Sequence, residues 1–343
     1  MKHTISMASI ALFVAVLTGC AAAAPSATPT PTQPAPTASA DVTPQTVRIG
    51  SLKGPTTMGL VGLMDQADRG LAVHDYEVEV YGTADQVVPL MVQGNLDIAL
   101  IPANLAAVLY QRTVGTDAQI EVLAINTLGV LTIVETGEAI NSMEDLRGRT
   151  IYSTGKGTTP EHVLNYLLSE NGLTPGVDVT VEFKSEATEV AAVLAADPAA
   201  IGVLPQPYVT VLMGANPDVR VALDLTEEWD AVATDSQLVT GVVVVRRAFA
   251  AEHPAVVTQF LADYRASTEF VNTLPTNAAP LIVAVGIAPN AAIAETAIPA
   301  CNIVYIDGAQ MRRMLEGYLG VLHAADPESV GGSVPGDDFY YSD

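Results

Sequence analysis

The stretch Ser51-Leu52-Lys53-Gly54-Pro55-Thr56-Thr57 has a counterpart 103 residues later, in Thr154-Gly155-Lys156-Gly157-Thr158-Thr159-Pro160. Lys53-Gly54 falls on Lys156-Gly157 and Thr56 falls on Thr159, and each copy opens a predicted helix after a predicted strand. The same shift aligns the apolar segments 78–80 with 181–183 and 100–102 with 203–205. Constant spacing over three strand–turn–helix units predicts two copies of one lobe. Few positions are identical, so chance similarity between α/β segments is the alternative.

The pattern around the first copy predicts an α/β sheet. Strands are expected at 47–52, 77–81 and 96–101, and helices at 56–67, 86–93 and 104–112. Strands that alternate with helices of this length form parallel, open sheets. The folded part, about 47–323, also exceeds the usual size of one domain, which favours two lobes.

The chain continues beyond the second copy, and this continuation predicts how the lobes are connected. The apolar run 238–245 reads as a buried strand, and helices are expected near 254–272, 291–298 and 309–324. We therefore expect a discontinuous first lobe (47–137 and 236–325) and an inserted second lobe (138–235). Two crossings, near 129–135 and 238–245, would form a double hinge that lets a cleft close around a solute. Residues 326–343 are expected to form an acidic, flexible tail.

The N-terminus predicts export. Lys2 and His3 precede an apolar run, 10–17, that is too short to span a bilayer and is typical of a signal peptide over 1–19. The run ends in Leu17-Thr18-Gly19-Cys20, which matches a bacterial lipobox, so Cys20 is expected to be lipidated and to anchor the protein to the cell envelope membrane. An ordinary secretory signal with a chance cysteine is the alternative. Residues 20–46 are rich in Ala, Pro and Thr and read as a semi-stiff tether.

The charge balance excludes one class of partner. Without Lys2 the chain carries 14 Lys and Arg against 38 Asp and Glu, a net charge of −24. Nucleic-acid binding needs clustered basic residues, so no nucleic-acid partner is expected. With Cys20 acylated, Cys301 has no partner for an intrachain disulfide and is expected to be a small buried residue.

Three further segments carry a resemblance. Gly50 to Thr56, Gly94-Asn95-Leu96-Asp97-Ile98-Ala99 and Ser142-Met143-Glu144-Asp145-Leu146-Arg147-Gly148, together with the lipobox and tether, resemble the ABC-importer binding lipoproteins for nitrate, sulfonates, taurine and thiamine-pyrimidine precursors. This resemblance covers nearly all of the mature chain. It implies the two-lobed α/β periplasmic-binding-protein fold with two crossover hinge strands. It also implies a membrane permease as partner. We further expect the permease's ATPase as a partner, no cofactor and a monomer.

The expected site lies where four turns converge in the cleft. In open α/β sheets, ligands bind beyond the carboxyl ends of the strands, where helix N-termini offer unpaired N–H groups and partial positive charge. Lys53 and Lys156 occupy equivalent turns and favour an anionic or acceptor-rich organic solute, although a solvated surface role is the alternative. The expected ligand-binding residues are Lys53, Gly54, Pro55, Thr56, Thr57, Thr83, Pro102, Asn104, Thr127, Thr154, Gly155, Lys156, Gly157, Thr158, Thr159, Pro205, Gln206, Ser236 and Gln237.

Other functions have weaker support. Asp97 could be a catalytic acid, but its place between a helix end and a strand favours a carboxylate that accepts backbone N–H groups. An enzyme on this fold would need clustered Cys and His, whereas Cys301 stands alone and the histidines are scattered. A sensory protein that presents its solute to a membrane receptor is a third possibility, because fold alone does not separate sensing from transport. We therefore predict a binding protein and no enzyme.

Overall fold

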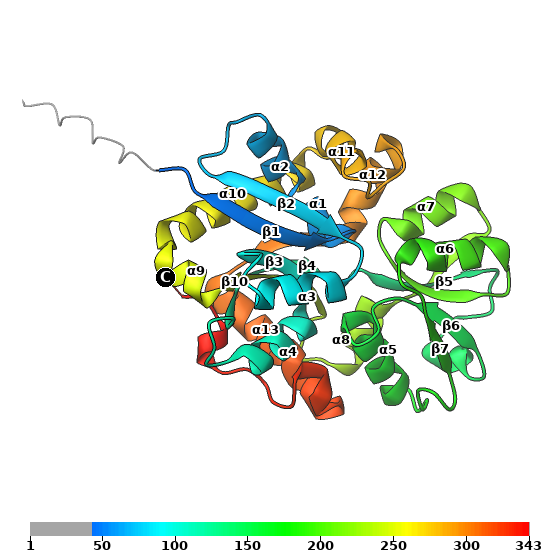
Figure 1. Cartoon of the computed structure of the whole chain (residues 1–343). Coiled ribbons are helices and arrows are strands. Elements are labelled where there is room, and N and C mark those ends of the chain that lie inside the picture. The colour runs from blue at the N-terminus through cyan, green and yellow to red at the C-terminus, as the bar shows by residue number, and fades with distance from the viewer. Residues whose placement is uncertain (1–42, 343) are drawn as a thin grey trace, which may run out of the picture. The chain divides into compact units, whose positions relative to one another are not determined.

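The computed structural model describes residues 43–342 (Figure 1). The predicted signal peptide, the lipidation site at Cys20 and most of the predicted tether lie outside the described residues. Among residues 43–342, no helix is both long and apolar enough to cross a membrane. The described chain forms two lobes, each built around its own sheet.

The first lobe holds a six-stranded mixed sheet in the order β11-β4-β10-β3-β1-β2. Its strands are β1 (Thr46–Leu52), β2 (Asp75–Tyr81), β3 (Ile98–Pro102), β4 (Ile120–Leu128), β10 (Val239–Arg246) and β11 (Ile303–Ile306). The pairs β1–β2 and β1–β3 are parallel, whereas β10 runs antiparallel between β3 and β4. The return strand β10 therefore lies inside the first sheet and fixes the late part of the chain to this lobe.

The second lobe repeats this arrangement with five strands in the order β7-β6-β8-β5-β9. Its strands are β5 (Leu131–Thr136), β6 (Thr150–Ser153), β7 (Thr180–Phe183), β8 (Ile201–Pro205) and β9 (Val219–Asp224). The antiparallel strand β5 lies between β8 and β9 as β10 lies between β3 and β4. The predicted two-lobed α/β architecture is confirmed, with two mixed sheets of matching order.

The lobe boundary lies earlier in the chain than the sequence suggested. β4 ends at Leu128 in the first sheet, and β5 begins at Leu131 in the second, so the first crossing is confined to Gly129 and Val130. Residues 131–137 were expected in the first lobe, but Leu131 pairs with Pro205 of β8. Only two residues separate β4 from β5, and both strands are largely apolar. The sequence therefore gives no sign that the chain passes from one sheet to the other here.

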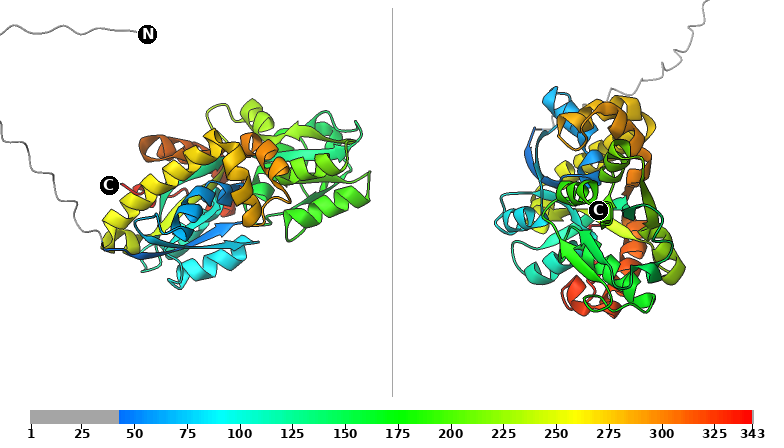
Figure 2. Two further views of the ribbon diagram at one scale, coloured as in Figure 1. Left: turned by 90° about the horizontal axis from the view of Figure 1, so that it is seen from above. Right: turned by 90° about the vertical axis from the view of Figure 1, so that its right-hand side faces the viewer.

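Helices cover both faces of the first sheet, and strand alternation explains why. In β10, Val242 and Val244 face the cluster that holds α3 and α4, whereas Val243 and Val245 face the cluster that holds α2 and α10. The first-lobe helices are α1 (Pro55–Met58), α2 (Val61–Asp68), α3 (Ala84–Val92), α4 (Ala103–Thr113), α9 (Arg247–Glu252), α10 (Pro254–Thr273), α11 (Pro275–Ala284), α12 (Ala291–Ala297) and α13 (Gly308–Ala325). The second-lobe helices are α5 (Thr159–Glu170), α6 (Ala187–Ala196), α7 (Tyr208–Ala215) and α8 (Leu225–Val232). Figure 2 shows α10 running along the first lobe.

An aromatic seam joins the lobes on one side. Trp229 of α8 is fully buried between Tyr166 of α5, with ring centroids 5.0 Å apart, and Tyr318 of α13, at 5.5 Å. Tyr166 belongs to the second lobe and Tyr318 to the first, so the Trp229 ring packs across the boundary between the lobes. This seam makes the apolar core continuous between the lobes.

The expected flexible tail is instead packed, so that prediction is wrong for residues 326–342. Val330 and Phe339 are fully buried, and Tyr340 bridges to Val122 of β4 beside β11. The Tyr110 hydroxyl also donates to the Asp338 carboxylate. The acidic composition suggested disorder, but a few apolar side chains within the segment suffice to fix it on the first lobe.

Candidate functional site

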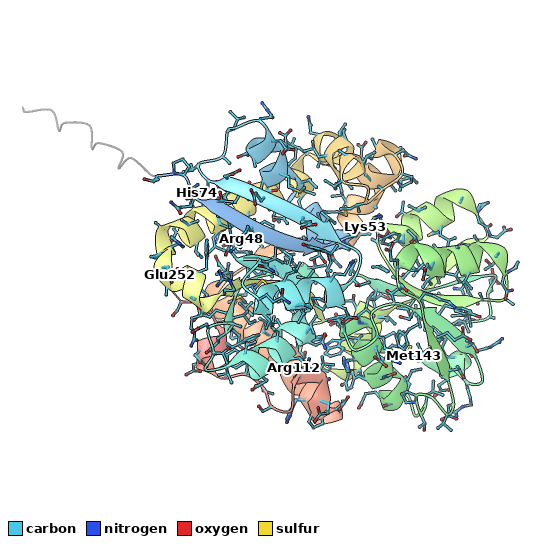
Figure 3. All side chains as sticks on the ribbon, viewed as in Figure 1. Arg48, Lys53, His74, Arg112, Met143 and Glu252 are labelled. Carbon is cyan, nitrogen blue, oxygen red and sulfur yellow. The ribbon has the colours of Figure 1, made fainter. Side chains whose placement is uncertain are left out.

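The two sheets point the carboxyl ends of their parallel strands toward a shared cavity of about 340 Å³. Residues that follow β1, β2 and β3 line it from the first lobe, and residues that follow β6, β7 and β8 line it from the second. Figure 3 places Lys53 on the side of the first lobe that faces the second. The cavity therefore lies where an open α/β fold binds its ligand.

Most of the predicted site residues meet in this cavity. Those that line it are Lys53, Pro55, Thr56, Thr83, Pro102, Thr127, Thr154, Gly155, Lys156, Thr158, Thr159 and Pro205. They come from the four predicted turns, which lie at the ends of β1, β3, β6 and β8, and also include Thr83 after β2 and Thr127 in β4. The remaining predicted residues do not line the cavity; these are Gly54, Thr57, Asn104, Gly157, Gln206, Ser236 and Gln237.

Local hydrogen bonds explain several of these exceptions. The Thr57 hydroxyl donates to the Leu52 carbonyl at 2.6 Å and lies 2.7 Å from the Ser51 hydroxyl, so it closes its own turn. The Gln206 side chain accepts from the Thr210 hydroxyl in α7. Ser236 lies beside Gly317 of α13, which takes the second crossing toward the seam and away from the cavity.

All three lysines of the described chain line the cavity: Lys53, Lys156 and Lys184. Lys53 and Lys156 form no ion pair with residues 43–342, whereas the Lys184 ammonium lies 3.5 Å from the Glu182 carboxylate and over the Tyr152 ring. No arginine of residues 43–342 lines the cavity. In a chain with 38 acidic residues, these three ammonium groups concentrate positive charge at one cavity.

Two hydroxyl groups from β4 and β10 of the first sheet lie within the cavity wall. Thr127 of β4 is 1% exposed, and its hydroxyl has no hydrogen-bond partner among the described residues. The Thr240 hydroxyl of β10 is likewise shielded from water and unpaired within residues 43–342. Thr240 lies at a register shift between Val239 and Gly241, and such bulges redirect side chains next to functional sites. Buried hydroxyl groups are normally satisfied, so these two unpaired hydroxyl groups are unusual features of the wall around the cavity.

Two carboxylates, Asp85 and Glu186, balance part of the positive charge at the cavity. Glu186 approaches Gly82 across the cleft so closely that a Cβ at Gly82 would lie 2.7 Å from its Oε1 atom. Burial, and then the nearby Glu186 charge, raise the pKa of Tyr208 to about 12, so its hydroxyl is a neutral donor at physiological pH.

Helix N-termini surround these side chains. Thr83 precedes α3, Thr158 precedes α5 and Glu186 precedes α6, and all three line the cavity. The first-turn N–H groups of a helix lack intrahelical partners, and the helix dipole adds partial positive charge there. Three helix N-termini and three ammonium groups therefore contribute positive potential at the cavity.

Five residues at the cavity were not expected from the sequence: Asp85, Lys184, Glu186, Tyr208 and Thr240. Lys184 and Glu186 could have been predicted by the 103-residue shift. They follow β7, the strand equivalent to β2, just as Gly82 and Thr83 follow β2 itself. Tyr208 is the first residue of α7, just beyond Pro205 and Gln206, the residues expected from the turn after β8. Thr240 could not be found, because its orientation depends on a bulge that strand periodicity does not reveal.

The comparisons agree with this geometry. Residues 63–279 match a protein family described as "ABC transporter, phosphonate, periplasmic substrate-binding protein". No curated protein sequence matches the chain. An ABC transporter structure from Parabacteroides distasonis is 21% identical, with a TM-score of 0.70, over 87% of this chain and 99% of that one.

Two further structures carry ligand names in their descriptions. The alkanesulfonate-binding protein SsuA from Xanthomonas axonopodis pv. citri is 16% identical, with a TM-score of 0.65, over 82% of this chain and 93% of that one. The periplasmic nitrate-binding protein NrtA from Synechocystis is 14% identical, with a TM-score of 0.54, over 69% and 65%. At these identities the structures establish the shared fold alone. The family match covers most of the chain, which therefore belongs to the phosphonate-type periplasmic substrate-binding proteins of ABC transporters, a family of non-catalytic binding components.

Proposed function

We propose that this protein captures a small organic solute with an anionic oxygen-rich group and delivers it to an ABC-importer permease by closure of its two lobes. The observation that carries the proposal is the position of the lysines. All three in the described chain line one cavity, although the protein as a whole is strongly acidic. Local charges at a binding site outweigh distant surface charges, which salt screens.

The comparisons support the same ligand class. The family description names phosphonate, and two similar structures are described as binding proteins for alkanesulfonate and nitrate. Phosphonate, sulfonate and nitrate groups share several anionic or acceptor oxygens around one centre. Apolar residues such as Leu52, Val130 and Leu131 also line the cavity, which suits a solute with a short apolar body.

Replacement of one cavity lysine should weaken binding strongly. We expect Lys53→Ala and Lys156→Ala each to lower the affinity for the best-bound anion about ten- to a hundredfold, because each removes a charge-assisted hydrogen bond worth about 1.5–3 kcal/mol. Native mass spectrometry of freshly purified protein would identify a co-purified solute, and calorimetry would measure its affinity. Short alkylphosphonates and alkylsulfonates are the first probes to titrate.

Arg112→Ala provides the control, since Arg112 is an exposed cation outside the cavity. It should bind the solute as the wild-type protein does. Wild-type affinity in both lysine variants would show that the lysines are ordinary surface charges. Binding of a neutral solute in preference to every anion would contradict the proposal as a whole.

We propose further that Cys20, outside the described residues, is the lipid anchor. Cys20→Ser removes the thiol that would accept the diacylglycerol group, so labelled palmitate should no longer be incorporated. The protein should then be released or remain unprocessed. Membrane retention and labelling equal to those of the wild-type protein would contradict the lipobox interpretation. Cys301→Ser is the matched control, because Cys301 is buried in the first lobe.

A further inference from the structure

Asn104 is fully buried at the start of α4 and does not line the cavity. Its Nδ2 atom donates to the Ser329 carbonyl at 3.0 Å and lies 3.5 Å from the Gly157 carbonyl. Its Oδ1 atom accepts from the Thr159 hydroxyl at 3.3 Å. One buried amide of the first lobe thus joins the C-terminal segment to a loop of the second lobe.

The loop that Asn104 contacts is the one that carries Lys156. Gly155, Lys156, Thr158 and Thr159 all line the cavity, so the loop lies between the solute position and Asn104. Any shift of this loop moves the Lys156 ammonium and the N-terminus of α5 together. Asn104 therefore lies one layer behind the cavity wall, in contact with the loop that carries Lys156.

Thr159 is surrounded by first-lobe partners although it belongs to the second lobe. Its hydroxyl accepts from the Tyr318 hydroxyl at 3.3 Å, and the Thr240 carbonyl, at 3.4 Å, is a second possible acceptor for it. Thr159 is fully buried in this arrangement. These contacts cross the lobe boundary, so rotation of the lobes away from each other would break them.

The bond from Asn104 to Ser329 behaves differently, because it lies within the first lobe. Ser329 belongs to the packed C-terminal segment and is 1% exposed. This bond holds the amide in place whether the lobes are open or closed. The second N–H group and the Oδ1 atom of Asn104 are then already oriented toward Gly157 and Thr159 of the second lobe. This orientation lowers the entropic cost of lobe closure.

We propose that Asn104 and Thr159 are positioning residues that stabilise the closed state, with Asn104 oriented by the C-terminal segment. The inference rests on the proposed function for its role in solute capture, but it concerns residues behind the cavity wall. A solute that binds only the closed state has an apparent affinity reduced by the fraction of protein that can close. Loss of the Asn104–Thr159 contact should therefore weaken binding through the closure equilibrium.

Distance measurements between the lobes test this directly. Nitroxide labels on Leu71→Cys in the first lobe and Val177→Cys in the second, which are 62% and 82% exposed, report lobe separation in the full chain carrying Cys20→Ser. Burial raises the pKa of the Cys301 thiol, which keeps it unreactive. We expect Asn104→Leu, which keeps the side-chain size, to shift the distances toward the open state and lower the closed-to-open ratio about tenfold.

Thr159 supplies a matched series. Thr159→Val keeps the shape and removes the hydroxyl, so it should produce the same shift, whereas Thr159→Ser should retain wild-type distances. The double variant Asn104→Leu/Thr159→Val should shift little further, because both changes remove one shared contact. Asn272→Leu is the control, since the Asn272 amide donates to the Ile303 carbonyl within the first lobe and should leave the distances unchanged.

A titration with methylphosphonate separates the two proposals. If both hold, the affinity of Asn104→Leu falls by the same factor as its closed fraction. If the distances respond but the wild-type protein binds neither methylphosphonate nor a related anion, the closure role stands and the proposed ligand class fails. Identical distance distributions in Asn104→Leu and the wild-type protein overturn the inference, even where the variant is less stable.

Discussion

A chain that ends at Ala325 should fail to form a stable protein. The deleted residues include Val330 and Phe339, which are fully buried, and Tyr340, which is 7% exposed. Each such side chain contributes about 1.5–3 kcal/mol by burial, so the loss is about 5–9 kcal/mol. A typical protein of this kind has a free energy of unfolding of only about 5–15 kcal/mol. Urea denaturation followed by circular dichroism would show a large fall of the midpoint or no cooperative transition.

Single substitutions distinguish packing from other effects of truncation. Phe339→Ala in the full chain should cost about 3–5 kcal/mol, because its ring is buried against Tyr110 with centroids 5.2 Å apart. Val334→Ala, in the same segment but 37% exposed, should change stability by less than about 0.5 kcal/mol. A truncated chain with the wild-type denaturation midpoint would show that the segment is not part of the folded core.

Elements with strong periodicity could be predicted from the sequence, and those fixed by tertiary context could not. The 103-residue shift aligned 100–102 with 203–205, and the structure has β3 at Ile98–Pro102 and β8 at Ile201–Pro205, which are 103 residues apart. The expected helix at 56–67 is instead two helices, α1 and α2, which Gly59 and Leu60 separate. Gly59 packs against Tyr264, Thr268 and Ile303, contacts far apart in the sequence that no local pattern contains.

The candidate site shows the same division. Lys53 and Lys156 were predicted because they occupy equivalent turns at the carboxyl ends of strands, a rule that depends on topology alone. Asn104 was predicted on the same rule, but it lies one layer behind the cavity because α4 turns its side chain toward Ser329. The orientation of a helical side chain depends on what packs beside the helix, and here that neighbour is the C-terminal segment, more than 200 residues away.

Asp97→Ala should be among the most destabilising single substitutions in the first lobe. The Asp97 side chain is 3% exposed and accepts from the Arg48 side chain at 2.6 and 2.9 Å and from Arg246 at 2.8 Å. It also accepts from the Arg48 backbone N–H at 3.0 Å, as the sequence suggested for this carboxylate. These bonds join β1, β3 and β10, and their loss leaves two arginines without their partner. We expect a cost of about 3–5 kcal/mol in urea denaturation.

The pH dependence provides the sharper test of this carboxylate. Burial opposes ionisation of Asp97, but hydrogen bonds from Arg48 and Arg246 hold its pKa below the ordinary value. A depressed folded-state pKa stabilises the protein fully above the unfolded-state pKa of about 4, and this contribution is lost as the pH falls through the folded-state pKa. The stability difference between the wild-type protein and Asp97→Asn should therefore be constant near neutral pH and shrink below about pH 4. Asp65→Asn, which alters an exposed pair with Arg69, should cost less than about 1 kcal/mol throughout. An equally small cost for Asp97→Asn, independent of pH, would show that the arginines are satisfied without the carboxylate.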